Sequence, residues 1–170
     1  FEKVGGDEVN NKHILVATAK WPLGEHRSIF ATLLLEHDAA ADLKVRAQPT
    51  AGYLWRQINR KTFWLDFDVG AGFVYEDYST TGDDTNIVGQ LGLKFEWRIT
   101  KQLTYTQRLV YFPNLSESPE YRLVSVSEFV TPVSTKVNFK LTILDQYNSD
   151  PAPGTKNNDL TITFALQFEL

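Results

Sequence analysis

The sequence contains no cysteine and no methionine in 170 residues. Without cysteine it can form no disulfide, no thiolate nucleophile and no zinc–thiolate site. No run approaches 18 consecutive apolar residues, which excludes a transmembrane helix. Basic tracts are absent as well, and the net charge of −4 argues against nucleic acid as a partner.

What the sequence does contain is strict alternation of apolar and polar residues, clearest at its C-terminal end. Over 160–170 the apolar side of the alternation carries Leu160, Ile162, Phe164, Leu166, Phe168 and Leu170, and the polar side Thr161, Thr163, Ala165, Gln167 and Glu169. Because successive side chains of a strand point to opposite faces, this pattern predicts a strand with one apolar and one polar face.

The same alternation recurs along the chain, and no segment has the 3.6-residue period of a helix. We predict one all-β domain over residues 1–170. Its nine strands lie at about 12–20, 27–37, 42–57, 62–76, 86–99, 103–112, 120–131, 134–146 and 159–170. The first of these is weakly marked, and 120–131 is ambiguous because it has apolar residues on both faces.

Periodicity alone does not distinguish a soluble barrel or sandwich from a barrel that spans a membrane. Three features favour the membrane. The apolar stripes are six or seven residues deep, longer than an ordinary strand requires. Tryptophan and tyrosine lie near strand ends, as interfacial girdles require. Tight connections such as 58–61 alternate with long polar ones at 77–85, 113–120 and 147–158. The fold predicted is an antiparallel up-and-down transmembrane β-barrel.

Strand parity extends this prediction. If Leu170 ends in the periplasm, the long loops face outward and the first visible strand begins outside the cell. Since such barrels start inside, we expect an odd number of strands to be missing upstream. The sequence begins at Phe1 with no charged n-region or apolar h-region, so any signal peptide has been removed or was never included. The complete barrel would have ten or twelve strands, and the segment from Gly5 to Asn11 would be an external loop.

The alternation assigns side chains to the two faces of the barrel wall. We expect the polar face to line the lumen through Asp66, Asp68, Lys94, Glu96, Arg98, Arg108, Lys136 and Lys140. We expect the apolar face to contact lipid through Leu91, Leu93, Phe95, Trp97, Phe139, Leu141, Phe164, Leu166 and Phe168. A narrow lumen must pair its charges, because unpaired burial costs several kcal/mol. This favours a salt-bridged plug over an ion-conducting path.

Other chemistry has little support in the sequence. His13, His26 and His37 lack partners at metal-ligand spacing. No serine lies in an elbow motif, although a catalytic triad assembled across strands would escape sequence analysis. The glycines of Gly70-Ala71-Gly72 lack the strand–turn–helix context of a phosphate loop. Asp77, Asp83 and Asp84 are better explained as solvated loop charge than as a calcium site. We expect no catalytic residue, no cofactor and no metal.

The C-terminal run from Leu144 to Asp159, followed by the alternating last strand, resembles the YdiY-type family of salt-induced outer-membrane proteins, also designated domain of unknown function 481. Asp42 to Arg46, Ala51-Gly52-Tyr53, Val69 to Phe73 and Tyr75-Glu76-Asp77 also match. The resemblance covers nearly the whole chain. It implies a β-barrel of the bacterial outer membrane and supplies no catalytic residues.

The sequence therefore favours a non-enzymatic cell-envelope protein of a Gram-negative bacterium, with a structural or scaffold role or a small, largely plugged pore. Its partners would be outer-membrane lipid and either other envelope proteins or a second chain pairing at an open strand edge. Two alternatives remain: a soluble periplasmic, lipocalin-like barrel that binds an apolar ligand, and a barrel enzyme that modifies lipid.

Overall fold

The computed structural model describes residues 2–4, 7–10, 12–80, 82–116, 120–151 and 156–168. Side chains are described from Lys12 onward, with Ala40 excepted. Within these ranges no helix has the length and apolar content needed to cross a membrane.

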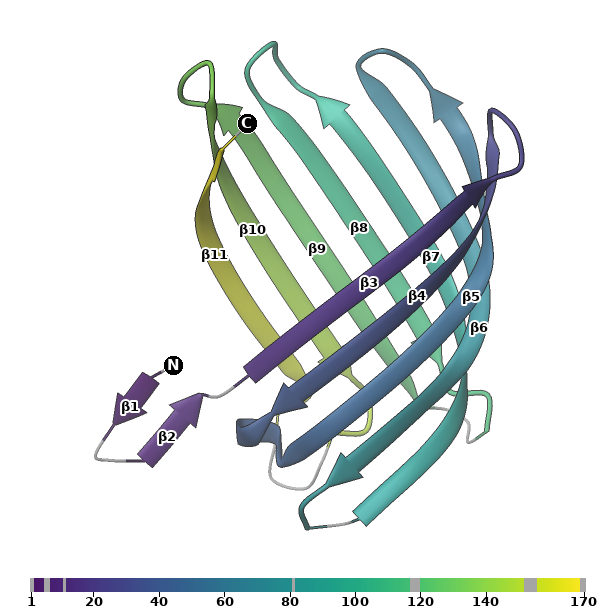
Figure 1. The fold of residues 1–170 in the computed structure, drawn as a ribbon, viewed down its shortest axis with the longest axis vertical. Helices are drawn as coiled ribbons and strands as arrows, with labels where there is room; N and C mark the ends of the chain where they lie inside the picture. Colours follow the sequence, from purple (N-terminus) through teal and green to yellow (C-terminus); the bar gives the residue numbers. More distant parts are fainter. Residues whose placement is uncertain are drawn as a thin grey trace.

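Nine strands within the described ranges form one antiparallel up-and-down sheet in which each strand pairs only with its neighbours in sequence (Figure 1). They are β3 (Lys12–Pro22), β4 (Arg27–Asp38), β5 (Leu43–Asn59), β6 (Phe63–Tyr78), β7 (Gly82–Arg98), β8 (Thr104–Pro113), β9 (Tyr121–Pro132), β10 (Val137–Asn148) and β11 (Asn158–Phe168). A single 3-10 turn, η1 (Ala39–Ala41), joins β4 to β5. The predicted strands are confirmed, with ends that differ by a few residues.

The sheet of nine strands curls into an open half-barrel. In Figure 1, β3 crosses in front of the sheet, and its first residues approach the start of β11 at the lower end while the two edges diverge above. Both edge strands run in the same direction, because an even number of reversals separates them. Within the described part of the chain, β3 and β11 each pair on one side only.

Contacts across the hollow identify the concave face. Arg122 of β9 donates a hydrogen bond to Gln48 of β5, and its guanidinium lies 3.8 Å from the carboxylate of Glu36 on β4. None of these strands is a neighbour of β9, so the three side chains project into the hollow. The register then places the even-numbered residues of β6 to β10 on the concave face and the odd-numbered residues on the convex face.

Polarity is inverted relative to a water-soluble barrel. Eight polar or charged residues in the described ranges are buried: Glu36, Asp38, Arg46, Gln48, Thr50, Asp66, Asp68 and Gln90. Large apolar residues on the convex face are instead exposed, and Phe164 retains 67% of its accessible surface. The hollow also buries a few apolar side chains, among them Phe30 and Val110.

Aromatic rings on the convex face form two rows, one near each end of the strands. At the end with the longer loops, the ring of Tyr121 lies 5.4 Å from the tilted ring of Tyr111 and stacks on Tyr147 at 5.8 Å, centroid to centroid. At the end with the short turns, the rings of Phe63, Phe95, Tyr105 and Phe129 follow one another across four strands.

Two predicted connections were wrong. The segment 77–85 was expected to be a long loop, but β6 and β7 continue to Tyr78 and Gly82, with Asp77 paired to Asp83. Backbone pairing with an adjacent strand overrides the low strand propensity of these residues. The positive φ of 86° at Gly82 suits the tight reversal that results.

The expected external loop from Gly5 to Asn11 was also wrong in part. Asp7–Asn10 forms strand β2, which pairs with β1 (Glu2–Val4) in a separate two-stranded sheet. Gly5, Gly6 and Asn11 lie outside the described residues, as do Glu169 and Leu170 of the predicted last strand.

Candidate functional site: the charged concave face

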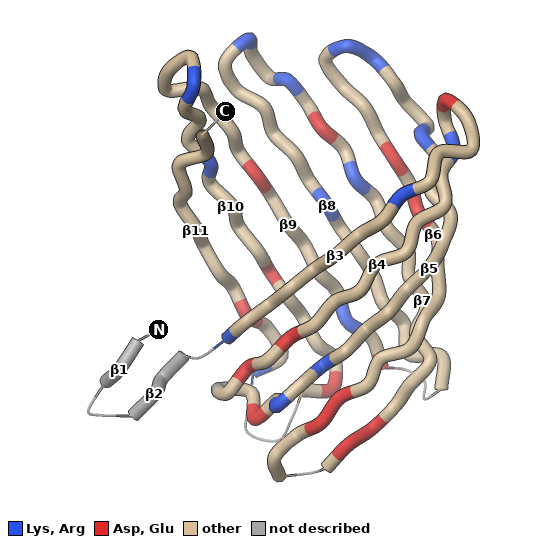
Figure 2. Tube along the Cα trace, viewed as in Figure 1, with Lys and Arg blue, Asp and Glu red and all other residues tan. Residues whose placement is uncertain are grey.

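The concave face carries a network of ion pairs near the ends of the strands that lead to the longer loops. We call this the long-loop network; its members are Lys12, Glu36, Asp38, Gln48, Glu76, Arg46, Arg122, Gln146 and Asp159. Figure 2 shows acidic and basic segments side by side in this part of β4, β5 and β6. Neighbouring strands bring Glu36, Arg46 and Glu76 into register in one row.

Arg46 is the centre of this network. Its Nη1 lies 2.5 Å from Oε2 of Glu36, and its Nε donates to Oε1 of Glu76. Arg122 adds a second guanidinium, held 2.5 Å from Oε1 of Gln48 and stacked 5.2 Å above the ring of Phe112. Burial of these charges is tolerated because each has an opposite charge or an amide oxygen at hand.

Lys12 connects the two edges of the half-barrel. Its Nζ lies 3.5 Å from Glu36 and 3.3 Å from Asp38 on the adjacent strand. The same Nζ lies 2.5 Å from Asp159 on β11 and 3.1 Å from Oε1 of Gln146 on β10. One ammonium group therefore holds the first strand of the sheet against the last two.

Phe30 occupies a bed of glycines on the concave face. A Cβ atom at Gly52 would lie 2.7 Å from Cζ of Phe30, and one at Gly70 would lie 3.2 Å from it. The register places Phe30, Gly52 and Gly70 side by side on β4, β5 and β6. Glycine is therefore required here by the close approach of the neighbouring backbone, since a Cβ would lie 2.2 Å from the carbonyl oxygen of Val69 at Gly52 and 2.7 Å from that of Ala51 at Gly70, and also by the ring of Phe30.

A second group of polar residues lies further along the wall. Asp68 accepts hydrogen bonds from both guanidinium nitrogens of Arg108, and its Oδ1 lies 2.6 Å from Nε2 of Gln90. The carboxylate fills the space above Gly92, where a Cβ would lie 2.3 Å from it. Asp66 accepts a bidentate pair from Arg56, at 2.7 and 3.1 Å. Both aspartates are 3% exposed, so each is buried only as a paired charge.

The remaining predicted lumen residues lie nearer the short turns and are less buried. Lys94 lies over the ring of Trp64, 5.5 Å from its centroid. Glu96 and Arg98 approach to 3.9 Å, and Lys140 pairs with Glu128 of β9 at 2.5 Å. Lys136 was wrongly assigned to a strand: it is exposed in the turn before β10.

The nine side chains predicted to contact lipid all lie on the convex face. Register pairs such as Leu93 with Phe67 and Phe139 with Leu166 place them there. Leu91, Trp97, Phe164, Leu166 and Phe168 are exposed, and the others are half-buried against neighbours on the same face.

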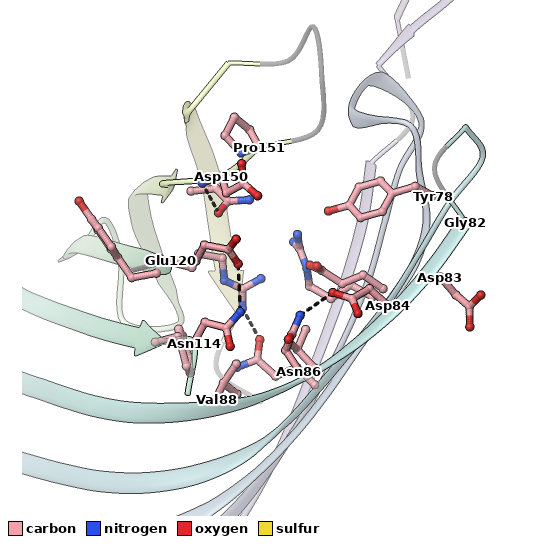
Figure 3. Close-up of a pocket in the computed structure, with 18 residues that line it drawn as sticks. Tyr78, Gly82, Asp83, Asp84, Asn86, Val88, Asn114, Glu120, Asp150 and Pro151 are labelled. Atoms are coloured by element: carbon pink, nitrogen blue, oxygen red, sulfur yellow. Dashed lines mark hydrogen bonds and ion pairs between the residues drawn. The ribbon is translucent and has the colours of Figure 1, made fainter. Parts of the chain in front are cut away.

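A cavity of about 430 Å³ lies where the concave face meets the longer loops. Figure 3 shows Asp84 and Asn86 of β7 facing Asn114 and Glu120 across it, with Asp150 and Pro151 above. Arg46 and Arg122 also line it. The cavity can hold water and small polar solutes. No group of three or more histidine, cysteine or acidic residues among the described residues is arranged to hold a metal ion.

Two of the histidines are occupied by ordinary contacts. His13 and His37 stack with ring centroids 6.2 Å apart, and Nδ1 of His37 lies 2.8 Å from the carbonyl oxygen of Lys44. This places both rings at the start of β3 and the end of β4.

Sequence analysis missed Lys12, Glu36, Asp38, Arg122, Gln146 and Asp159 as members of the site. Their contacts join strands that are far apart in the chain, so no local pattern reveals them. The only available signal was a charged residue at a polar-face position of an otherwise apolar segment, as at Glu36 among Leu33, Leu34 and Leu35.

Comparison with known proteins yields one match. The chain fits, over residues 1–170, the family described as protein of unknown function, DUF481. No curated protein and no solved structure matches it. The resemblance drawn from the sequence motifs is thus confirmed at the level of the family: the chain belongs to the DUF481 family.

Proposed function

We propose that this chain forms the wall of a β-barrel in the bacterial outer membrane, that its role is structural rather than enzymatic, and that its own charges close the lumen. The observation that carries the proposal is the inverted polarity of the sheet. Charged residues such as Asp66 and Glu36 are buried on the concave face, while the convex face presents large apolar side chains. An apolar outer wall of this extent matches acyl chains rather than water.

The height of the apolar band on the convex face supports a location in a membrane. From Leu160 to Phe168 every outward residue of β11 is apolar. Nine residues extend about 27 Å along a strand, and a typical tilt of about 40° reduces this to roughly 20 Å. The two convex aromatic rows flank the band, as interfacial girdles do.

In the membrane the open edges of β3 and β11 must be paired, because an unpaired backbone group in lipid costs several kcal/mol. Both edges run in the same direction. An odd number of further strands therefore restores antiparallel pairing on both sides, which gives barrels of ten or twelve strands. Two copies joined edge to edge in one orientation would instead meet as parallel strands.

The long-loop network supports a plug. Its cations Lys12, Arg46 and Arg122 lie against the carboxylates of Glu36, Asp38, Glu76 and Asp159. Phe30 and the pair of Asp68 with Arg108 add further material to the hollow. A charge that is already paired offers little to a passing ion, so the arrangement favours a scaffold.

A small pore is the second candidate, and the cavity near the longer loops favours it. The two are separated by planar-bilayer conductance of the intact protein and of a variant carrying Asp66→Asn and Asp68→Asn. A pore gives unitary steps whose size or selectivity changes in the variant, whereas a plug gives none.

The membrane location is tested by the depth at which an arginine is tolerated. Leu93→Arg, in the middle of β7, is expected to cost about 2–4 kcal/mol, whereas Ile99→Arg, in the turn after β7, should cost about 0–1 kcal/mol. The measurements are extraction from membranes, which should require detergent, and heat-modifiable migration on gels. A protein that is monodisperse in plain buffer, with both variants equally tolerated, would contradict the proposal and favour the soluble barrel.

A further inference from the structure

The two outer strands of the half-barrel, β3 and β11, border a gap in its wall. Each has 11 residues, and the two run in the same direction. Within the described part of the chain each pairs on one side only. If the wall lies in a membrane, as proposed above, lipid offers no hydrogen-bond partner to the backbone groups on the free sides. A strand that runs antiparallel to both can supply those partners.

Lys12 limits the width of this gap at the end with the longer loops. Its Nζ, on β3, lies 2.5 Å from Oδ2 of Asp159 on β11. A lysine side chain reaches about 6 Å from its Cα atom and an aspartate about 3.5 Å, so these two Cα atoms are at most about 12 Å apart. Neighbouring strands are about 4.8 Å apart, so one inserted strand separates β3 from β11 by about 10 Å and three by about 19 Å. The contact therefore admits one strand and excludes three.

The position of β1 indicates which segment fills the gap. β2 ends at Asn10 and β3 begins at Lys12, and β2 lies against η1, the turn that follows β4. β2 thus continues the line of β3, with η1 on the side of β4. β1 pairs with β2 and so lies on the other side of this line, where the gap is. The pairing is antiparallel, with Glu2 opposite Asn10, so continuing the same ladder places the residues before Phe1 beside β3.

We propose that one strand of the same polypeptide, formed by the residues immediately before Phe1, fills the gap and pairs with both β3 and β11. It runs toward the longer loops, turns through β1 and β2 and returns as β3, which makes one long hairpin. The 11 residues of β3 set its length. Added to the nine strands of the sheet, it closes a barrel of ten strands, an even number as bacterial barrels require.

The neighbours across the gap define the side chains that this strand carries. On the convex face Leu15 of β3 and Phe164 of β11 retain 62% and 67% of their accessible surface, so its outward residues are apolar. On the concave face it lies between Val16 and Thr163, so its inward residues at this level are uncharged. The side chain of Lys12 passes over it to reach β11, so the inward residue beneath Lys12 is small.

Closure also requires a movement at the other end of the gap. There β3 and β11 lie apart in Figure 1, whereas beside Lys12 they are already close enough for one strand. Pairing along both edges draws the far ends together, so the completed wall has one strand between β3 and β11 at both ends. The separation at the far end is therefore the quantity to measure.

Dipolar broadening between spin labels on the full-length polypeptide in membranes measures this separation. Residues 1–170 contain no cysteine, so labels attach in this part of the chain only at introduced cysteines. Ala19→Cys with Leu166→Cys spans the far end of the gap on the convex face. His13→Cys with Leu160→Cys spans the end beside Lys12 on the same face.

Two reference pairs within the sheet calibrate the measurement. Ala19→Cys with Ala51→Cys has one strand between the labels, because Ala31 of β4 is the register partner of both. Val69→Cys with Tyr147→Cys has three strands between the labels, β7, β8 and β9. Both gap pairs are expected to match the first reference, with about 10 Å between the backbones, and not the second.

A disulfide scan identifies the strand. Ala17→Cys, on the convex face of β3, is combined with single cysteines at successive positions before Phe1, and the protein is oxidised in isolated membranes. One position should form an intrachain disulfide about five-fold more than the positions beside it, because only directly paired residues meet the distance that a disulfide requires. A scan without such a maximum, or a disulfide to another chain, would overturn the proposal.

This proposal deepens the proposed function and rests on its membrane location, and the two fail differently. If the protein is in the membrane fraction and the far gap pair matches the three-strand reference, or couples more weakly than it, the single strand is wrong and the location stands. Absence of the unmodified protein from the membrane fraction overturns both.

Discussion

The wall of the half-barrel has two parts that share the same topology but differ in how polar and apolar residues are divided between the concave and convex faces. In β4 to β7 the concave face buries paired charges such as Arg46 with Glu36, and the convex face is apolar. In β9 the concave face carries Val124, Val126 and Val130 as well as the charged Arg122 and Glu128, while Ser125 and Ser127 point outward. The same alternation thus serves two different distributions of polarity.

This difference shows that the formation of a strand and the polarity of its two faces have separate causes. Alternation is enough to specify an edge-to-edge pairing, and both parts pair regularly. Which face is polar depends on what that face contacts. In β4 to β7 the neighbours are the hollow and, on our proposal, lipid; in β8 and β9 the outward polar groups of Gln107, Ser125 and Ser127 bond to one another.

The largest effect should come from filling the glycine bed. A Cβ at Gly52 would lie 2.2 Å from the carbonyl oxygen of Val69 and 2.7 Å from Cα of Gly70. Gly52→Val is therefore expected to destabilise the fold by about 3 kcal/mol or more, which would be seen as loss of the heat-modifiable band. Ala51→Val, the exposed neighbour on the same strand, is the control.

Enlarging a side chain on the concave face of β9 should destabilise the fold only slightly. Val126 is half-buried on the concave face, so Val126→Ile should cost less than about 1 kcal/mol. Equal loss of folding in Gly52→Val and Val126→Ile would show that the two parts are packed alike and would break the comparison.

A smaller effect should follow from removing one buried cation. Arg46→Met removes the guanidinium that Glu36 and Glu76 share, while Lys12 and Arg122 stay beside Glu36. We therefore expect a loss at the lower end of about 3–5 kcal/mol in the free energy of unfolding, measured by urea titration in detergent or vesicles. The matched change in the other part is Glu128→Gln. Its pair with Lys140 is about 30% exposed on both sides, so the loss should be about 0–1 kcal/mol. Comparable losses would contradict the difference between the two parts.

The smallest effect should be a pH-dependent loosening of one turn. Asp42, at a positive φ of 58° before β5, accepts hydrogen bonds from the hydroxyl and the amide of Thr80. The Thr80 hydroxyl bond is the main cause that holds the pKa of Asp42 below its ordinary value. A lowered pKa means that the contact stabilises the fold above the ordinary aspartate pKa and is lost as the pH falls through the lowered one.

Hydrogen exchange checks this against a neutral contact in the other part of the wall, where the amide of Tyr121 donates to Oγ of Ser149 at 2.8 Å. After correction for intrinsic rates, acidification should reduce protection at Thr80 and leave Tyr121 unchanged. Asp42→Asn keeps a residue that tolerates positive φ and should remove the pH dependence. A parallel loss of protection at both amides would point to general unfolding.

The strands could be predicted because their signal is local. Leu91, Leu93 and Phe95 alternate with Gly92 and Lys94 and need no knowledge of other strands. The turn between β6 and β7 was mispredicted because Asp77 and Asp83 extend the ladder only when each has the other to pair with. β9 stayed ambiguous because its valines face the hollow, where the pattern led us to expect polar residues.

The sequence predicted which kinds of residue lie on the polar face, but not which of them contact one another. Asp66 and Asp68 were correctly expected on the polar face, yet their partners Arg56 and Arg108 depend on register across strands. Arg122 and Gln48 are 74 positions apart and meet only because the sheet curls. Curvature is a property of the whole sheet, so a scan of single segments cannot supply it.

The clasp made by Lys12 has a consequence for assembly. It fixes the two margins of the wall at one end only, close to the longer loops, and leaves them apart at the other. Any strand that completes the cylinder therefore finds a narrow entrance with a set spacing beside Asp159 and an increasingly wide gap beyond it. Pairing of such a strand with β3 and β11 would begin beside Lys12 and proceed toward the other end of the wall. Loss of Lys12 would remove the contact at which this pairing begins.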